Sequence, residues 1–118
     1  MASISVALQE LLCASELSVE EALTRHVADD YRQSTDGNWL DRAAFAQQLT
    51  QLRGAIERVE IEVLNELAYD RAYAERHVIT CTLRDGSRVS QEVFVFAEIA
   101  RDGRFARLEE LTRLLPAE

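Results

Sequence analysis

Two Asp-Gly dipeptides divide the second half of the chain into long runs of residues that favour β-structure. Asp85-Gly86 and Asp102-Gly103 separate the last three of these runs. Glycine adopts the positive φ of a tight turn, so Asp-Gly between alternating apolar runs is a strong signal for a β-hairpin. The runs are 57–67, 69–83, 87–100 and 104–115. The sequence therefore predicts an antiparallel sheet of long strands.

Helical patterns occupy only the first half. Apolar residues at helical spacing, among them Ile4 and Leu8, predict a first helix. Ser18 and Glu21 have the spacing of a capping box, so a second helix is predicted to begin at Ser18 and to end near His26. Helices followed by a meander of strands are typical of an α+β fold, with the helices packed on one face of the sheet.

The segment between the second and third helices is predicted to be extended and then to turn. A short strand is expected at 27–34 and a turn at 35–38, where glycine and asparagine suit a left-handed φ. A third helix is predicted to begin at Asp41, because apolar residues flank this position in the hydrophobic-staple arrangement. Gly54 has the position of a glycine that ends this helix. Its expected buried stripe is Phe45, Leu49 and Leu52.

Length and charge restrict the possible partners. A chain of 118 residues is expected to form one domain, 1–118, with 47% hydrophobic residues. The formal net charge of -8 disfavours binding to nucleic acid or to anionic membranes. No signal peptide or membrane-length apolar run is visible, and the two cysteines, Cys13 and Cys81, are expected to be buried thiols. We therefore expect a cytoplasmic protein with no metal and no cofactor.

The strands carry apolar residues on both faces. Val93 and Val95 share one face, whereas Phe94 and Phe96 share the other. A sheet that is apolar on both faces must be covered on both. Three helices cover only one face of a sheet this long, so the sequence predicts a homodimer that forms through the other face.

The order and spacing of these elements resemble the nuclear transport factor 2-like (NTF2-like) superfamily, and within it the SnoaL-like branch. The segments that carry the resemblance are Asp29-Asp30-Tyr31, 37–45, Glu75-Arg76-His77, 96–105 and Leu108-Glu109-Glu110. The resemblance implies a cystatin-like cone, in which three N-terminal helices pack on a curved, mainly antiparallel sheet around an apolar pocket. Relatives include ketosteroid isomerases, polyketide cyclases, limonene epoxide hydrolases and non-catalytic binding modules, so the fold alone does not identify a reaction.

Arg76 and Glu110 are the candidate catalytic residues that this resemblance implies. Glu75-Arg76-His77 is similar to the Glu-Arg-x-Asp segment of the epoxide hydrolases, where an arginine lies between two pocket carboxylates. Such an array can activate water and protonate an epoxide. Val78 replaces one of the two carboxylates, which weakens this interpretation. The alternatives are an Arg76–Glu110 ion pair between adjacent strands, or two solvated side chains.

Isomerase chemistry by the route of the ketosteroid isomerases is not supported. The position that matches the general base is Ser34, and a serine alone cannot abstract a proton from carbon. Asp36 is expected to shape the turn, and Tyr31 to be either a pocket hydroxyl or a core aromatic residue. By alternation, His77 is placed opposite Arg76, on the face assigned to the dimer contact.

Three functions remain open. The first is a protein that binds a small apolar molecule in the cone-shaped pocket, and the second is an isomerase, cyclase or hydrolase that uses Arg76 and Glu110. The third is a non-catalytic dimeric scaffold whose cone is filled by side chains. Trp39 is expected at the mouth of the cone, either as a lid or as an aromatic wall. The residues predicted to contact a ligand are Tyr31, Trp39, Phe94 and Phe96.

Overall fold

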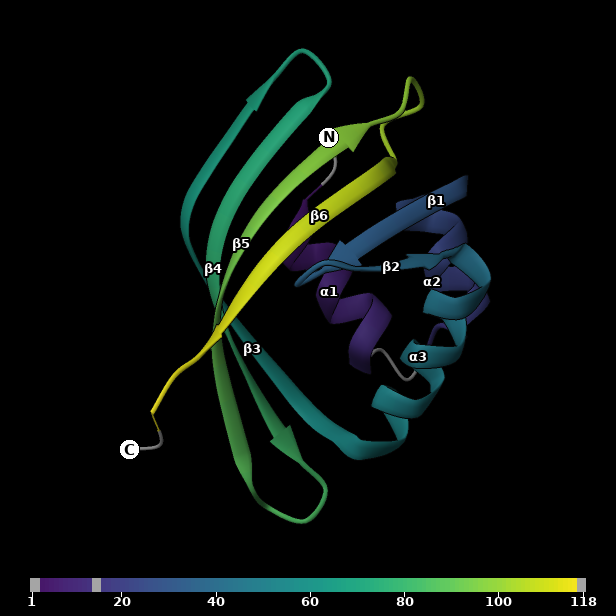
Figure 1. The fold of residues 1–118 in the computed structure, drawn as a ribbon. Coiled ribbons are helices and arrows are strands. Elements are labelled where there is room, and N and C mark those ends of the chain that lie inside the picture. The colour runs from purple at the N-terminus through teal and green to yellow at the C-terminus, as the bar shows by residue number, and fades with distance from the viewer. Residues whose placement is uncertain (1–2, 14–15, 117–118) are drawn as a thin grey trace.

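A computed structural model describes residues 3–13 and 16–116, and Figure 1 shows their arrangement. Within these ranges the chain forms three helices and six strands. The helices are α1 (Ile4–Cys13), α2 (Val19–His26) and α3 (Arg42–Ala55). The strands are β1 (Val27–Thr35), β2 (Asn38–Asp41), β3 (Ile56–Tyr69), β4 (Ala72–Leu83), β5 (Arg88–Ile99) and β6 (Phe105–Leu114). The predicted α+β fold is confirmed.

The six strands form one curved sheet in the order β2-β1-β6-β5-β4-β3. Every neighbouring pair is antiparallel except β1 and β6, which run parallel. The sheet bends around the helices, which all lie on its concave side (Figure 1). The two predicted Asp-Gly hairpins are present, with Gly86 at φ 90° and Gly103 at φ 92°. Among the described residues, no helix lies on the convex side of the sheet (Figure 1).

Local side-chain chemistry sets where α2 and α3 begin. The predicted capping box of α2 is complete: Glu21 N–H donates to Ser18 Oγ, and Ser18 N–H donates to Glu21 Oε1, both at 3.0 Å. Asp41 caps α3 by accepting a hydrogen bond from Ala44 N–H at 2.8 Å.

Among residues 3–13 and 16–116, no helix is long and apolar enough to cross a membrane.

Four details differ from the sequence predictions. Gly54 does not end α3, which continues to Ala55. The run 69–83 contains a turn between β3 and β4, made by Asp70 at φ 56° rather than by glycine. In the turn after β1, Asp36 and Gly37 have positive φ, whereas the asparagine that follows them starts β2. Leu52 is 36% exposed, so the buried residues of α3 are Phe45 and Leu49 alone among the three expected.

Arg53, near the end of α3, holds the C-terminal end of α1 in place. Its guanidinium donates to three main-chain carbonyls, from Nε to Leu11 O at 2.8 Å, from Nη2 to Glu10 O at 2.6 Å and from Nη1 to Leu17 O at 2.5 Å. The last carbonyls of a helix have no partner within the helix, so a cation that binds them stabilises that end. α1 lies across the concave side of the sheet, and Arg53 thereby fixes one wall of the interior (Figure 1).

We expect the change Arg53→Met to lower the free energy of unfolding by about 2 kcal/mol, because three carbonyls lose a charged donor. Urea denaturation measures this loss. The matched control is Arg58→Met on β3, where the arginine side chain is 64% exposed and its loss is expected to cost under ~0.5 kcal/mol. Equal losses for the two variants would contradict the role assigned to Arg53.

Candidate functional site

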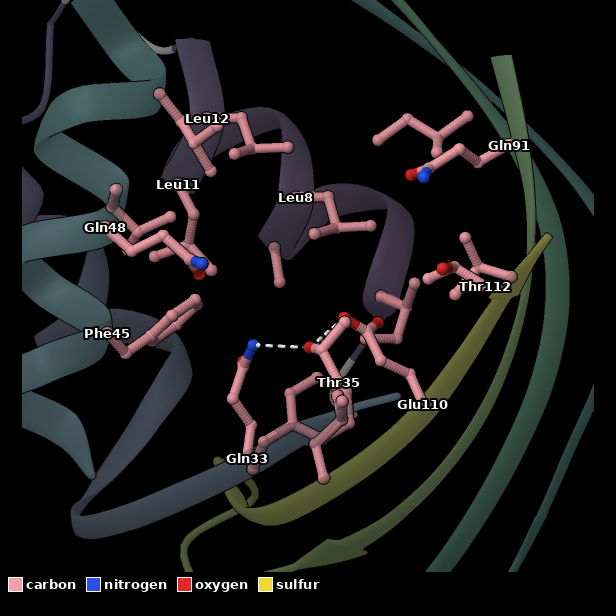
Figure 2. A pocket seen from close by; sticks show the side chains of 18 of the residues that line it. Leu8, Leu11, Leu12, Gln33, Thr35, Phe45, Gln48, Gln91, Glu110 and Thr112 are labelled. Atoms are coloured by element: carbon pink, nitrogen blue, oxygen red, sulfur yellow. Dashed lines mark hydrogen bonds between the residues drawn. The ribbon is translucent and has the colours of Figure 1, made fainter. Parts of the chain in front are cut away.

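The concave face of the sheet, α1 and α3 enclose a cavity of about 360 Å³ (Figure 2). This volume suits a small organic ligand. Helical residues supply most of the apolar wall: Ile4, Ala7, Leu8, Leu11, Leu12, Phe45, Leu49 and Leu52. The polar groups come mainly from the strands and the turn after β1: Tyr31, Gln33, Thr35, Asp36, His77, Gln91, Glu110 and Thr112. The cavity thus has a mainly apolar helical side and a sheet side that mixes polar and apolar residues.

A line of hydrogen bonds runs along β1 to Glu110 on β6. Tyr31 Oη donates to Gln33 Oε1 at 2.8 Å, and Gln33 Nε2 donates to Thr35 Oγ1 at 3.4 Å. Thr35 Oγ1 donates to Glu110 Oε1 at 2.8 Å. Figure 2 shows Gln33, Thr35 and Glu110 converging at the base of the pocket. These residues meet because alternate residues of a strand point to the same face, and β1 pairs with β6 so that Thr35 stands beside Glu110.

Glu110 lies in a setting that favours its neutral form. Burial raises the pKa of its carboxyl above the ordinary value of 4.5, and the nearby carboxylates Asp36 and Glu75 raise it further. The hydrogen bond from Thr35 and the proximity of His77 act in the opposite direction but do not cancel the effect of burial. A carboxyl that is neutral can donate its proton to a ligand, which an ionised one cannot.

His77 is the second titratable group in the cavity wall, and Glu75 holds its ring. Glu75 Oε1 lies 2.6 Å from His77 Nδ1, and both side chains are almost completely buried. A carboxylate at this distance accepts the Nδ1 proton, which directs the lone pair of the neutral ring to Nε2. Within the described residues, Glu75 Oε2 is buried without a hydrogen-bond partner. Glu75 contacts the imidazole but is not among the residues that line the cavity.

The charges of the lining are acidic. Asp36 and Glu110 are carboxyls, and His77 is the one lining residue among the described residues that can carry a positive charge. Asp36 is held in the turn by two hydrogen bonds from Thr112, one from its N–H at 2.8 Å and one from its hydroxyl at 2.5 Å. Residues 3–13 and 16–116 contain no group of three or more His, Cys, Asp and Glu side chains that could hold a metal ion.

Arg76 lies outside this cavity. Its Nη1 is 3.3 Å from Glu92 Oε2 and its Nε donates to Asn65 Oδ1 at 2.9 Å, both on the convex face of the sheet. Strand β5 separates β4 from β6. Arg76 and Glu110 are thus neither on adjacent strands nor on the same face, and the structure does not bring them together. The expected assignment of the strand faces is wrong, because His77 rather than Arg76 points inward.

The aromatic residues predicted to line the pocket divide in the same way. Tyr31 is inside, 2% exposed, with its ring packed on Phe45. Phe94 and Phe96 are on the convex face, 46% and 60% exposed. Trp39 is 44% exposed, and the guanidinium carbons of Arg32 and Arg107 lie 5.0 Å and 5.2 Å from the centre of its ring. Trp39 is therefore neither a lid nor a wall of this cavity.

Gln33 and Thr35 are among the pocket groups that the sequence analysis did not single out. The signal for them was available, because Tyr31, Gln33 and Thr35 alternate along one strand and so share a face. The inward direction of His77 could also be inferred, since it alternates with Ile79 and Cys81, which line the cavity too. Cys13 and Cys81 are both free thiols and are partly buried.

We expect Glu110→Gln to raise the melting temperature at pH 8. A carboxyl whose pKa is raised by folding stabilises the fold fully below its unfolded pKa, and this contribution is lost as the pH rises through the folded pKa. The variant has no ionisable group there, so its advantage over the wild type should disappear below pH 4.5, the ordinary pKa of the group. The control is Glu109→Gln on the opposite face, which should show no such pH-dependent gain. An equal gain in both variants would contradict burial of the Glu110 charge.

No protein-family model matches the chain, and curated protein sequences give no significant match. Solved structures do resemble it. A proposed isomerase from Rhodopseudomonas palustris has a TM-score of 0.76 and 16% identity, covering 92% of this chain and 84% of that one. An NTF2-like protein of unknown function from Exiguobacterium sp. 255-15 has a TM-score of 0.70 and 16% identity, and the match covers 94% of this chain and 98% of that one. The proposed polyketide cyclase IdmH from Streptomyces antibioticus has a TM-score of 0.69 and 15% identity, and the match covers 92% of this chain and 88% of that one. The chain has the NTF2-like fold.

Proposed function

We propose that the protein binds a small, largely apolar molecule in the cavity, and that Glu110 and His77 catalyse a proton transfer on it. The observation that supports this most directly is the presence of both groups in the wall of one apolar cavity. One polar atom of each group already has a hydrogen-bond partner: Thr35 bonds Oε1 of Glu110, and Glu75 bonds Nδ1 of His77. The remaining atoms, Oε2 and Nε2, are then available to a ligand.

The sheet register sets the spacing of the two groups. Glu75 pairs with Val95, which pairs with Glu110, so Glu110 is two strands away from the strand of His77. Neighbouring strands lie about 4.8 Å apart, which gives about 10 Å between the two backbones. The side chains of His77 and Glu110 extend from these strands into the same cavity. This spacing suits an acid and a base that act on different atoms of the same ligand.

The chemistry that fits is removal of a proton from the carbon next to a carbonyl group. His77 Nε2 takes this proton, the C–H electron pair forms a carbon–carbon double bond, and the carbonyl oxygen receives the proton of neutral Glu110. In a β,γ-unsaturated ketone the intermediate is a dienol. Return of the proton from His77 to its γ-carbon, with return of the other proton to Glu110, moves the double bond into conjugation and completes an isomerisation. An acid and a base placed in the wall of one cavity are typical of such acid–base catalysis. This route needs no cofactor.

The structural neighbours support this class of reaction. One is a proposed isomerase and another a proposed polyketide cyclase. The cavity also argues against a scaffold whose cone is filled by side chains. His77 takes the place of Arg76 as the partner of Glu110 in this proposal, because Arg76 is hydrogen-bonded to Glu92 on the convex face.

Exchange of carbon-bound hydrogen for solvent deuterium tests the proposal without knowledge of the natural substrate. A panel of small cyclic ketones and enones is incubated with the protein in heavy water and followed by NMR. We expect faster exchange for at least one compound, and a loss of roughly 100-fold or more for His77→Gln and for Glu110→Gln. Arg76→Met and Glu109→Gln are the matched controls, because each changes the adjacent charged residue on the opposite face.

Binding without exchange would leave a ligand-binding protein and remove the catalytic part of the proposal. Exchange that survives in His77→Gln, or that falls equally in Arg76→Met, would contradict the assigned residues. Calorimetry with the same compounds separates these cases, because it detects binding whether or not a proton moves.

We also propose that the convex face forms a homodimer. Its centre carries apolar side chains that are unusually exposed for a single chain: Leu67 70%, Phe94 46%, Phe96 60% and Leu111 64%. These side chains form two neighbouring rows across the sheet. In one row, Leu67 on β3 and Phe96 on β5 pair with the same residue of β4. In the other row, Phe94 on β5 pairs with Leu111 on β6. A contiguous apolar patch marks an interaction surface, and a two-fold pair is the commonest way to cover it. Dimerisation of this kind, and a cytoplasmic location, stay predictions.

Phe96→Glu should convert the dimer to a monomer, because it places two charges at the centre of the proposed contact. Sedimentation velocity measures the change in mass. Glu98→Gln, two residues along the same face, is the control and should remain dimeric. A wild-type protein that is monomeric at micromolar concentration would contradict the proposed interface.

A further inference from the structure

The hydrogen bonds that lead to Glu110 have a direction. The Tyr31 phenol has its proton accepted by Gln33 Oε1, so the NH2 group of that amide faces Thr35. Thr35 Oγ1 accepts from this NH2 group, and its own proton is then directed to Glu110 Oε1. Every donation in this line points towards Glu110. The Gln33–Thr35 contact, at 3.4 Å, is the longest of the three.

The opposite orientation of the Gln33 amide is unfavourable while Tyr31 keeps its hydroxyl. With the amide reversed, the NH2 group would face the phenol, and the buried phenol proton would lose its acceptor. A buried donor without a partner costs the full desolvation of that group. Tyr31 is 2% exposed, so water does not readily replace the lost partner. Tyr31 therefore selects the amide orientation, and the amide orientation selects the direction of the Thr35 hydroxyl.

We propose that Tyr31 is a positioning residue that acts on Glu110 through Gln33 and Thr35, by fixing the direction in which each intervening group donates. The consequence is that Oε1 of Glu110 is always the acceptor of a hydrogen bond. Its proton, when present, is then confined to Oε2, the oxygen left for the ligand. This inference rests on the proposed function only for the role of Oε2. The control of the ionisation of Glu110 by Tyr31 is independent of any reaction.

Other groups around Glu110 also affect its charge. Asp36, from the turn after β1, and Glu75, from β4, both raise its pKa, and His77 lowers it. The residues that α1 and α3 present to the cavity are uncharged: Ile4, Ala7, Leu8, Leu11, Leu12, Phe45, Gln48, Leu49 and Leu52. Changes within the line of hydrogen bonds leave all these groups in place. A shift of the Glu110 titration in such variants therefore reports the hydrogen bonds themselves.

Tyr31→Phe tests the inference two links away from Glu110. Without the phenol, the amide of Gln33 is free to reverse, and its oxygen can accept the Thr35 proton. Glu110 then loses the hydrogen bond that favours its charged form, so its pKa should rise. We expect the acid dissociation constant of Glu110 to fall roughly twofold to tenfold, the size expected for one lost hydrogen bond. The measurement is a pH titration of the side-chain carboxyl carbon by NMR, assigned by the missing signal in Glu110→Gln.

Matched variants separate this effect from general loosening of the core. Thr35→Val removes the last link and should shift the titration in the same direction, whereas Thr35→Ser keeps the hydroxyl and should not. Tyr73→Phe is the control for loss of a buried phenol, since Tyr73 is 1% exposed and its hydroxyl is bonded to Glu66 and to Ile4 N–H instead. If Tyr31→Phe does not fold, Gln33→Leu breaks the same line and carries the same expectation.

An upward shift in Tyr31→Phe and Thr35→Val, without one in Tyr73→Phe and Thr35→Ser, supports the inference. A shift in Thr35→Val alone would overturn the part played by Tyr31, and equal shifts in Tyr31→Phe and Tyr73→Phe would overturn it as well. The deuterium-exchange screen is separate from this titration. Failure of the screen removes the proposed reaction, whereas failure of the titration removes the line of control from Tyr31.

Discussion

The parallel pairing of β1 with β6 is the contact on which the site depends. It joins segments that lie 75 residues apart in the chain and places Thr35 beside Glu110. Antiparallel hairpins alone would give the meander of β3 to β6, with Glu110 in the last strand and no partner from the first half of the chain. The pairing also aligns the inward face of β1 with that of β6, so Tyr31, Gln33 and Thr35 reach the same cavity as Glu110.

The two faces of the sheet serve different purposes because strand residues alternate. The concave face is buried under three helices, and its few titratable groups are hydrogen-bonded to neighbours. Glu75 is hydrogen-bonded to His77, and Thr35 to Glu110. Burial makes the charged form of Glu110 costly, which works against stability at neutral pH but supplies a carboxyl that can donate a proton. On the convex face, Arg76 and Glu92 form a partly buried ion pair beside the apolar rows. Site and contact surface are thus opposite sides of one sheet.

Local signals in the sequence predicted much of the fold. The capping box at Ser18 and the turns at Gly86 and Gly103 form as expected, because each depends on a few neighbouring residues. The turn at Asp70 was missed, since a non-glycine residue with positive φ has a weaker signal. The site was harder to predict, because assigning the strand faces to the helices requires tertiary packing. Reversal of that one assignment placed Arg76, Phe94 and Phe96 in the pocket and His77 outside it.

The central claim is that the concave side holds an open cavity in which one ligand meets both Glu110 and His77. A crystallographic screen of small ketone and alcohol fragments tests this most directly. The account predicts fragments bound between the helices and the sheet, with an oxygen within hydrogen-bond distance of Glu110 Oε2 and the fragment body reaching His77. A cone filled by side chains, or fragments bound only on the convex face beside Phe94 and Phe96, would contradict it.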